Sequence, residues 1–209
     1  MLRWTIRIIA ILVLALFAFE GYRLLDAART LEVRMARHIA PTPSLRAWQL
    51  DAIVRVQDPS FRSHSGIEWP SPLTTTTITQ SLVKRIYFEG FRPGFQKVEQ
   101  TLVATFVVDP RVSKDLQLRA FAQTAYFGHR NGRSVIGFED AARTWFDSSL
   151  QALTRDQFLS LLAMLPSPNS LLPGSAQAAV RVERIKRLLA SQCVHTRIAE
   201  IQLEQCSAQ

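Results

Sequence analysis

Residues 57–66 read Gln-Asp-Pro-Ser-Phe-Arg-Ser-His-Ser-Gly, and this is the most informative stretch of the 209-residue chain. It combines a carboxylate, an aromatic ring, a histidine and a glycine, and we expect it to lie in a loop over 58–73. Its first residue, Gln57, carries an amide that cannot accept a proton near neutral pH, whereas its neighbour Asp58 is a carboxylate that can. Any proton-transfer chemistry here therefore depends on which of these two side chains faces a ligand.

The composition limits the size of the protein and the charge of its partners. A chain of 209 residues with 47% apolar side chains suits one domain of ordinary size plus a short attachment. The formal charge of +8 and the pI near 10.3 favour an anionic partner. Because no nucleic-acid recognition motif is visible, we expect an anionic phospholipid surface, and no nucleic acid.

Two cysteines, Cys193 and Cys206, lie near the C-terminus on a stretch that we expect to be helical. In an oxidising periplasm they could form a bridge, but the sequence does not establish one. Two cysteines at this spacing do not make a metal-ligand signature. We expect neither a metal nor an organic cofactor.

Twelve consecutive apolar residues, 8–19, stand near the N-terminus. Twelve are fewer than the roughly 20 that span a bilayer, but a helix over 4–25 reaches that length if its charged side chains extend toward the headgroups. We therefore expect a transmembrane anchor at 1–25. A cleaved signal peptide and a buried core helix are the alternatives, although no good cleavage site follows the apolar run. Arginines on both sides leave the orientation undecided.

The rest of the chain reads as a stalk followed by one mostly helical domain. Apolar residues at helical spacing over 24–39 predict that the anchor helix continues, and Pro41-Thr42-Pro43 breaks it. We expect a stalk and linker at 26–43 and the domain at 44–209. A second loop is expected at 128–137. Helical periodicity predicts helices over 45–56, 96–107, 114–126, 155–165 and 178–189.

Four further segments accompany 57–66. Residues 76–84 read Thr-Thr-Ile-Thr-Gln-Ser-Leu-Val-Lys, and residues 95–99 read Phe-Gln-Lys-Val-Glu. Residues 126–146 contain Tyr-Phe-Gly, Ala-Ala and Trp-Phe, and residues 153–173 contain Leu-Thr, Leu-Leu-Ala and two later prolines. In this order and at this spacing, the segments resemble the signatures of the family 51 glycosyltransferases, the peptidoglycan polymerases of bacterial membranes.

The resemblance implies a mostly α, lysozyme-like glycosyltransferase domain with a membrane-associated subdomain and an N-terminal transmembrane helix. It implies a single-pass protein of the bacterial inner membrane with its domain in the periplasm. The family joins disaccharides carried on undecaprenyl pyrophosphate, by inverting hexosyl transfer from lipid II. The implied partners are lipid II or a glycan strand, inner-membrane lipids, and cell-wall or envelope assembly proteins. Because the chain ends soon after the last segment, we expect no transpeptidase domain to follow.

The chain departs from the family at its catalytic positions. The family's first signature begins with Glu, the general base, and Gln57 stands there instead. The third signature, Arg-Lys-x-x-Glu, keeps Glu99 but loses both cations, and Lys97 nearby is expected on another helix face. A general base is worth about 10²–10⁴ in rate, so we expect impaired catalysis. Asp58 is the only obvious substitute base, but adjacent side chains on a helix point roughly 100° apart. The candidate catalytic residues are thus Gln57, Asp58 and Glu99.

The candidate substrate-binding residues also have ordinary structural interpretations. His64 can fix its loop, and Thr77 can cap a helix that begins near Ile78. Lys84 can form an ion pair with Glu99. We favour the paired, structural role for Glu99. The candidates are His64, Thr77, Gln80, Lys84 and Lys97.

Three functions are compatible with these residues. The chain is a catalytically impaired protein that binds lipid II or nascent glycan, an active glycosyltransferase that polymerises lipid II, or a non-catalytic interaction module of an envelope assembly. An open groove on which Lys84, Lys97, Arg92 and Glu99 converge would favour the first two. A groove filled by Phe91 or Phe95 would favour the third.

Overall fold

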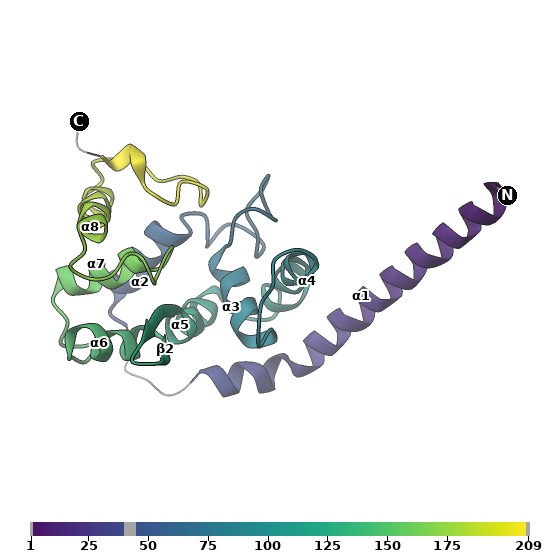
Figure 1. Ribbon diagram of the computed structural model, residues 1–209, viewed down its shortest axis with the longest axis horizontal. Helices are drawn as coiled ribbons and strands as arrows, with labels where there is room; N and C mark the ends of the chain where they lie inside the picture. Colours follow the sequence, from purple (N-terminus) through teal and green to yellow (C-terminus); the bar gives the residue numbers. More distant parts are fainter. Residues whose placement is uncertain (1, 40–44, 208–209) are drawn as a thin grey trace.

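The computed structural model describes residues 2–39 and 45–207, and most of them are helical, as the sequence predicts (Figure 1). Two short strands, β1 (Tyr126–Arg130) and β2 (Arg133–Ile136), pair antiparallel. The helices are α1 (Leu2–His38), α2 (Ala47–Gln57), α3 (Ile78–Tyr87), α4 (Phe95–Val103), the π-helical η1 (Ala104–Val108), α5 (Lys114–Thr124), α6 (Phe138–Phe146), α7 (Arg155–Met164), α8 (Ala176–Leu189) and the 3-10 helix η2 (Glu204–Cys206).

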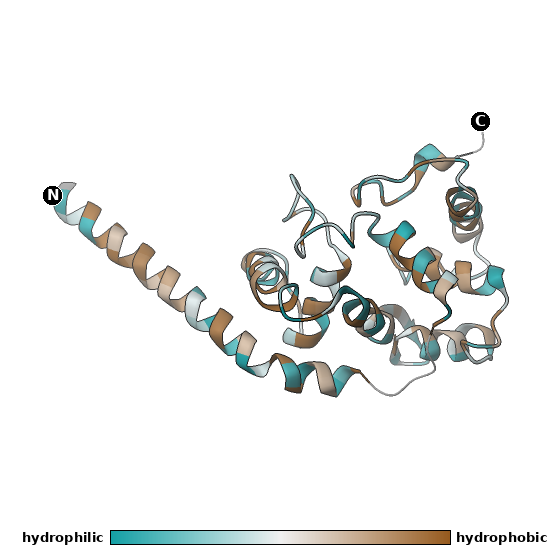
Figure 2. Ribbon diagram, turned by 180° about the vertical axis from the view of Figure 1, so that it is seen from behind, coloured by the Kyte–Doolittle hydropathy of each residue, from teal (hydrophilic) through white to brown (hydrophobic). Residues whose placement is uncertain are grey.

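Helix α1 has two halves with different surroundings. Its N-terminal half projects from the domain and is mainly apolar (Figures 1 and 2), and by length and composition it could cross a membrane. Its C-terminal half buries Ala27, Leu31 and Met35, which share one face at a spacing of four residues. These side chains pack with α3, η1 and α5. The helix thus continues through 24–38, as predicted, whereas the expected break at 41–43 lies outside the described residues.

Two hydrophobic clusters form the core. The larger one joins α2, α5, α6, α7, α8 and the hairpin around three aromatic rings. Phe138 lies edge-on to Phe127 at 4.8 Å between ring centroids and stacks with Phe158 at 5.4 Å. The smaller cluster joins α1, α3, η1 and α5. The membrane-length helix is therefore attached to the smaller cluster and not to the larger one.

The five helices predicted from periodicity are confirmed, but the predicted loop at 128–137 is wrong. It forms the β1–β2 hairpin, in which Tyr126 pairs with Ile136. The turn residues Asn131 and Gly132 have φ angles of 52° and 76°, which two-residue hairpin turns require. Asn-Gly is a strong hairpin signal, and the sequence analysis overlooked it. The hairpin also explains why α5 ends at Thr124 and not at Tyr126.

Helix α6 was not predicted either, and it begins next to a glycine that the fold requires. Gly137 has a φ of 82°, and a Cβ there would lie 2.5 Å from the carbonyl oxygen of Gln123. Its amide donates to the carbonyl of Ala125 at 2.7 Å. The glycine therefore lets the chain leave β2 close to the end of α5 and start α6.

The two cysteines form a disulfide, Cys193–Cys206, which the sequence had left open. Contrary to expectation, the stretch that carries them is irregular apart from the short 3-10 helix η2, which ends at Cys206. Helix α8 ends at Leu189, and Ser191 takes a left-handed conformation with a φ of 58°. We call residues 193–206 the C-terminal strap. In Figure 1 it is the yellow segment that runs from α8 toward the blue loop before α3.

Candidate functional site

A cavity of about 530 Å³ lies where the C-terminal end of α2 meets the N-terminal half of α3. The end of α5, the start of β1, the segment after α7, helix α8 and the strap complete its walls. Among the residues that the structure describes, none of those lining it is an aspartate or a glutamate. Its polar lining includes Gln57, Thr74, Thr75, Thr76, Thr77, Ser81, Lys84, Arg85, Tyr126 and Arg181.

Gln57 is the last residue of α2, and it lines this cavity. Its Nε2 atom is buried and has no hydrogen-bond partner among the described residues. A buried donor without a partner costs roughly 1–3 kcal/mol, so an acceptor oxygen on a ligand would remove a penalty. The position predicted for the base thus lies at the cavity, but it presents an amide that can bind and cannot take a proton.

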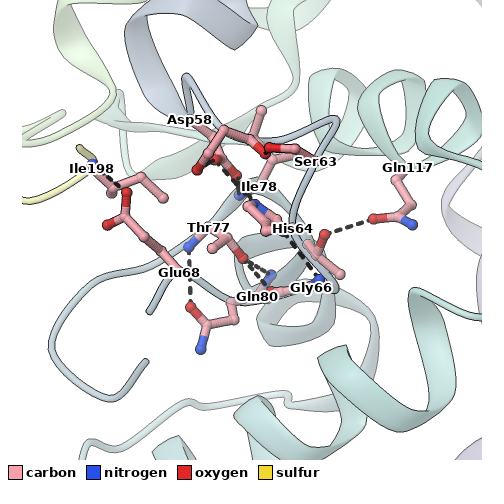
Figure 3. A network of polar contacts seen from close by, with 12 residues as sticks. Asp58, Ser63, His64, Gly66, Glu68, Thr77, Ile78, Gln80, Gln117 and Ile198 are labelled. Carbon is pink, nitrogen blue, oxygen red and sulfur yellow. Dashed lines mark hydrogen bonds and ion pairs between the residues drawn. The ribbon is translucent and has the colours of Figure 1, made fainter. Parts of the chain in front are cut away.

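Asp58 faces the protein interior instead. It is fully buried, and its Oδ2 accepts from the backbone amide of Ile78 and from Nε2 of His64, both at 2.9 Å (Figure 3). It does not line the cavity. The expected divergence between Gln57 and Asp58 is therefore present. The Oδ2 atom of Asp58 ties the loop at 58–66 to the start of α3, and its Oδ1 atom accepts from His64 within the loop.

His64 serves the same loop. Its Nδ1 accepts from the amide of Gly66 at 3.1 Å, so the ring hydrogen is on Nε2, which donates to Asp58. Gly66 is itself required, because a Cβ there would lie 2.7 Å from the carbonyl oxygen of Ala104. Neither residue lines the cavity that contains Gln57. His64 thus fixes this loop and lies outside the cavity that contains Gln57.

Thr77 and Gln80 form the capping box of α3, as Figure 3 shows. The Thr77 hydroxyl donates to the carbonyl of Gly66 at 2.7 Å and accepts from the Gln80 amide at 3.0 Å. The Gln80 side chain accepts from the Thr77 amide and donates to the carbonyl of Pro72 at 2.8 Å. Thr77 reaches the cavity wall and Gln80 does not. Both fix the helix whose next turns carry the cavity's cations.

Lys84 and Lys97 are the predicted substrate contacts that come together. Lys84 lines the cavity, and its ammonium lies 4.9 Å from the centre of the Phe91 ring. Lys97 donates to the carbonyl of Thr75 at 2.7 Å and to the hydroxyl of Thr76 at 3.2 Å, and both threonines line the cavity. Lys97 does not line the cavity itself, and it holds two of the threonines that do, because the segment before α3 folds over it.

Burial lowers the pKa values of both lysines. Desolvation, followed by the neighbouring charge of Lys84, lowers the pKa of Lys97 to about 8. Desolvation and the charge of Arg85 also lower the pKa of Lys84. Lys97 therefore carries a charge that changes within an accessible pH range, next to the threonines of the cavity wall.

Glu99 lies on the far side of α4 from Lys97. The two are two positions apart, roughly 200° around the helix, so they cannot share a wall. Glu99 accepts from Nε of Arg23 in α1 at 2.8 Å and from a second nitrogen of the same guanidinium. The predicted ion pair with Lys84 is therefore wrong, although Glu99 is paired as expected. Arg92 is exposed and does not line the cavity.

The expected convergence is thus partial, and the cavity is not filled by aromatic rings. Phe91 packs against Phe88 and the Lys84 ammonium, and Phe95 is 52% exposed at the start of α4. Neither ring lines the cavity. Of the four residues expected to converge on an open groove, Lys84 lines the cavity, whereas Lys97, Arg92 and Glu99 do not.

Comparison with known proteins explains this combination of elements. The sequence model of the transglycosylase family matches residues 26–192. The chain belongs to the transglycosylase family. Its match begins within α1 and ends just before the strap, so it includes the whole cavity except the part that the strap supplies.

Relatives of this transglycosylase-family chain carry related names. It is 30% identical over 132 residues to a biosynthetic peptidoglycan transglycosylase of Alcanivorax borkumensis, covering 56% of this chain and 52% of the relative. It is 28% identical over 135 residues to the protein of that name from Bordetella avium (56% and 54%). It is 29% identical over 137 residues to penicillin-binding protein 1B of Vibrio cholerae (57% and 17%). The chain thus spans about half the length of the first two and a sixth of the third.

The sequence analysis missed two cavity cations of this transglycosylase domain. Arg85 follows Lys84 and lies 5.1 Å from the centre of the Tyr126 ring. Arg181 is only 3% exposed, and burial, with the nearby charge of Arg184, lowers its pKa to about 10. A signal was available, since Arg181 occupies the apolar face of α8. An arginine within such a stripe indicates a buried cation with a specific task.

Proposed function

We propose that this chain is a membrane-anchored transglycosylase-family protein that binds lipid II or nascent glycan and has lost most of its polymerising activity. The observation that carries the proposal is the cavity itself. It is lined by Gln57 at the base position and by the cations Lys84, Arg85 and Arg181, without a lining carboxylate. Such a cavity attracts phosphate oxygens and lacks a proton acceptor of suitable strength.

Inverting transfer from lipid II makes two demands on a site. The acceptor oxygen bonds to the anomeric carbon while the bond from that carbon to the pyrophosphate breaks, so a base must take the hydroxyl proton. Positive charge must also stabilise the departing pyrophosphate. The cavity meets the second demand. For the first, the carboxylates predicted from the sequence are Asp58, which is buried in the loop network, and Glu99, which is paired with Arg23.

Membrane attachment supports the choice of a lipid-linked ligand. The apolar half of α1 is long enough to cross a bilayer. On the continuous helix α4–η1, the side chains of Phe95, Val98 and Phe106 are 52%, 38% and 58% exposed. We infer that these side chains contact the inner membrane beside α1. The Cys193–Cys206 disulfide favours a domain on the periplasmic side, where disulfides persist.

Replacing Lys84 by Met should weaken lipid II binding by roughly ten- to hundredfold, because a charge-assisted hydrogen bond contributes about 1.5–3 kcal/mol. Binding of labelled lipid II to the full chain in detergent measures the effect. Lys186→Met is the matched control, since Lys186 pairs with Asp156 and Glu183 on the surface, away from the cavity. Equal affinities for the two variants would contradict a phosphate site at Lys84, and no binding by the wild type would contradict the proposed function.

The affinity for lipid II should fall as the pH rises through about 8, the pKa of Lys97. This pKa is depressed, so the amine is charged below pH 8 and progressively neutral above it. An anion binds the charged form better, and linkage limits the fall to about tenfold per pH unit. Binding measured from pH 6.5 to 9.5 tests this. Lys97→Arg keeps its charge over that range and should flatten the profile; an unchanged slope in that variant would refute the assignment.

An active glycosyltransferase is the second candidate, and one observation favours it: the cavity is open, and its phosphate-binding cations are present. A non-catalytic interaction module has less support, because neither Phe91 nor Phe95 fills the cavity. In that case envelope assembly proteins, and not lipid II, would be the partners. A polymerisation assay on the wild type distinguishes the impaired protein from the active glycosyltransferase. A lipid II binding measurement distinguishes both of them from the interaction module.

A further inference from the structure

The C-terminal strap is the part of the cavity that lies beyond the transglycosylase match. The match ends at residue 192, and the strap covers 193–206. Three strap residues, Ile198, Ala199 and Ile201, nevertheless line the cavity together with Gln57 and Lys84. The strap therefore adds a wall of small and apolar side chains to a site whose other walls come from the family domain.

Polar contacts hold the strap on both sides of the cavity. The amide of Ile198 donates to Oε1 of Glu68, in the loop before α3, at 3.0 Å (Figure 3). The two ring nitrogens of His195 face the carbonyl of Arg55 in α2 at 3.1 Å and that of Arg197 at 2.8 Å, and the nitrogen that carries the hydrogen donates. These contacts join the strap to two elements far away in the sequence. The strap thus runs along the cavity from α8 to the loop before α3, and hydrogen bonds hold it in place.

Arg181 depends on the strap for its position. One of its terminal nitrogens donates to the carbonyl of Ile201, and its Nε is buried without a partner among the described residues. Its neighbour Arg184 donates to the carbonyl of Gln202 at 2.8 Å. No ion pair of Arg181 with a carboxylate occurs in the described part of the chain. A buried cation that contacts only carbonyl groups and lines a cavity is suited to an anionic ligand.

We propose that the disulfide-closed strap is a working part of the ligand site: it forms one wall against the bound ligand and positions Arg181 toward its phosphates. The inference rests on the proposed binding of lipid II and adds the element that this chain contributes beyond the family domain. Arg181 is a ligand-contacting residue in this scheme, and the carbonyl of Ile201 is the group that orients it.

The disulfide is what keeps the strap closed. It joins two residues 13 positions apart, so it restricts the open conformations of the segment between them. The strap itself buries few apolar side chains, chiefly Ile198 and Leu203. Reduction should therefore increase the open population at the strap while the larger core remains folded. If the closed fraction falls to roughly a tenth, the apparent affinity falls about tenfold.

Reduction is a clean test because the sequence contains two cysteines, and both are in this bridge. Binding of labelled lipid II is measured for the oxidised and the reduced full chain in detergent, with circular dichroism to verify the fold. We expect roughly tenfold weaker binding after reduction. The double variant Cys193→Ser/Cys206→Ser should match the reduced protein and no longer respond to reductant. Equal affinity in the oxidised and reduced chain would overturn the inference while leaving the proposed function intact.

A matched pair of strap variants tests the wall directly. Ile201 and Val194 are both exposed apolar residues of the strap, at 49% and 63%, but only Ile201 lines the cavity. Ile201→Ser should weaken lipid II binding several-fold, and Val194→Ser should not. Equal effects of the two substitutions would overturn the inference. If the oxidised wild type binds no lipid II at all, the proposed function fails, and the inference fails with it.

Discussion

Gln57→Glu should raise polymerisation of lipid II by about 10²–10⁴-fold over the wild type, the range that a positioned general base contributes. The substitution exchanges the buried, unpartnered Nε2 for an oxygen of nearly the same size. A carboxylate there would face the same cavity as Lys84 and Arg85, whose positive charges favour its ionised form. It would also recover the family's residue at that position. The product is measured as labelled glycan separated by gel electrophoresis.

The choice of controls decides what such a gain would mean. Gln57→Met keeps the size of the side chain without a proton acceptor, so it should polymerise lipid II no faster than the wild type. Glu99→Gln in the Gln57→Glu background tests whether the carboxylate paired with Arg23 contributes from outside the cavity. Polymer made by the wild type at the rate of Gln57→Glu would refute impairment and point to an active enzyme with another base.

Part of this site could be predicted from the sequence because it depends on local rules. Thr77 is followed three positions later by Gln80, which is a capping box, and the structure has it. The divergence of Gln57 and Asp58 follows from helix geometry alone. Such predictions need only a few neighbouring residues and their spacing.

The other contacts of the site depend on which elements meet in space. The spacing of residues along the sequence does not show this. The partner of Glu99 comes from α1, 76 positions away, so Lys84 was the wrong choice. Lys97 contacts the cavity-lining Thr75 and Thr76 only because the segment before α3 folds over α4. Arg181 belongs to the cavity only because the strap returns to α8. The hairpin at 126–136 is different, because its Asn-Gly turn was visible in the sequence and was overlooked.

Asp58→Ala should lower the free energy of unfolding by roughly 3–5 kcal/mol, the cost of removing one partner from a buried, hydrogen-bonded charge network. Asp58 is fully buried, and its loss would leave the Ile78 amide and the His64 Nε2–H without an acceptor. The loop at 58–66 would then lose its tie to α3. For a chain of this size the melting temperature should fall by roughly 10 °C. Thermal unfolding followed by circular dichroism measures it.

Two further variants separate this structural role from a catalytic one. Asp51→Ala removes an exposed carboxylate from the same helix, α2, and should change stability by less than about 0.5 kcal/mol. Asp58→Asn keeps an acceptor for the Ile78 amide but turns a donor toward His64, so its stability should lie between those of the wild type and Asp58→Ala. If Asp58 only ties the loop, Asp58→Asn should still bind lipid II at temperatures below its melting point. A variant as stable as the wild type that loses polymerisation would instead make Asp58 the substitute base.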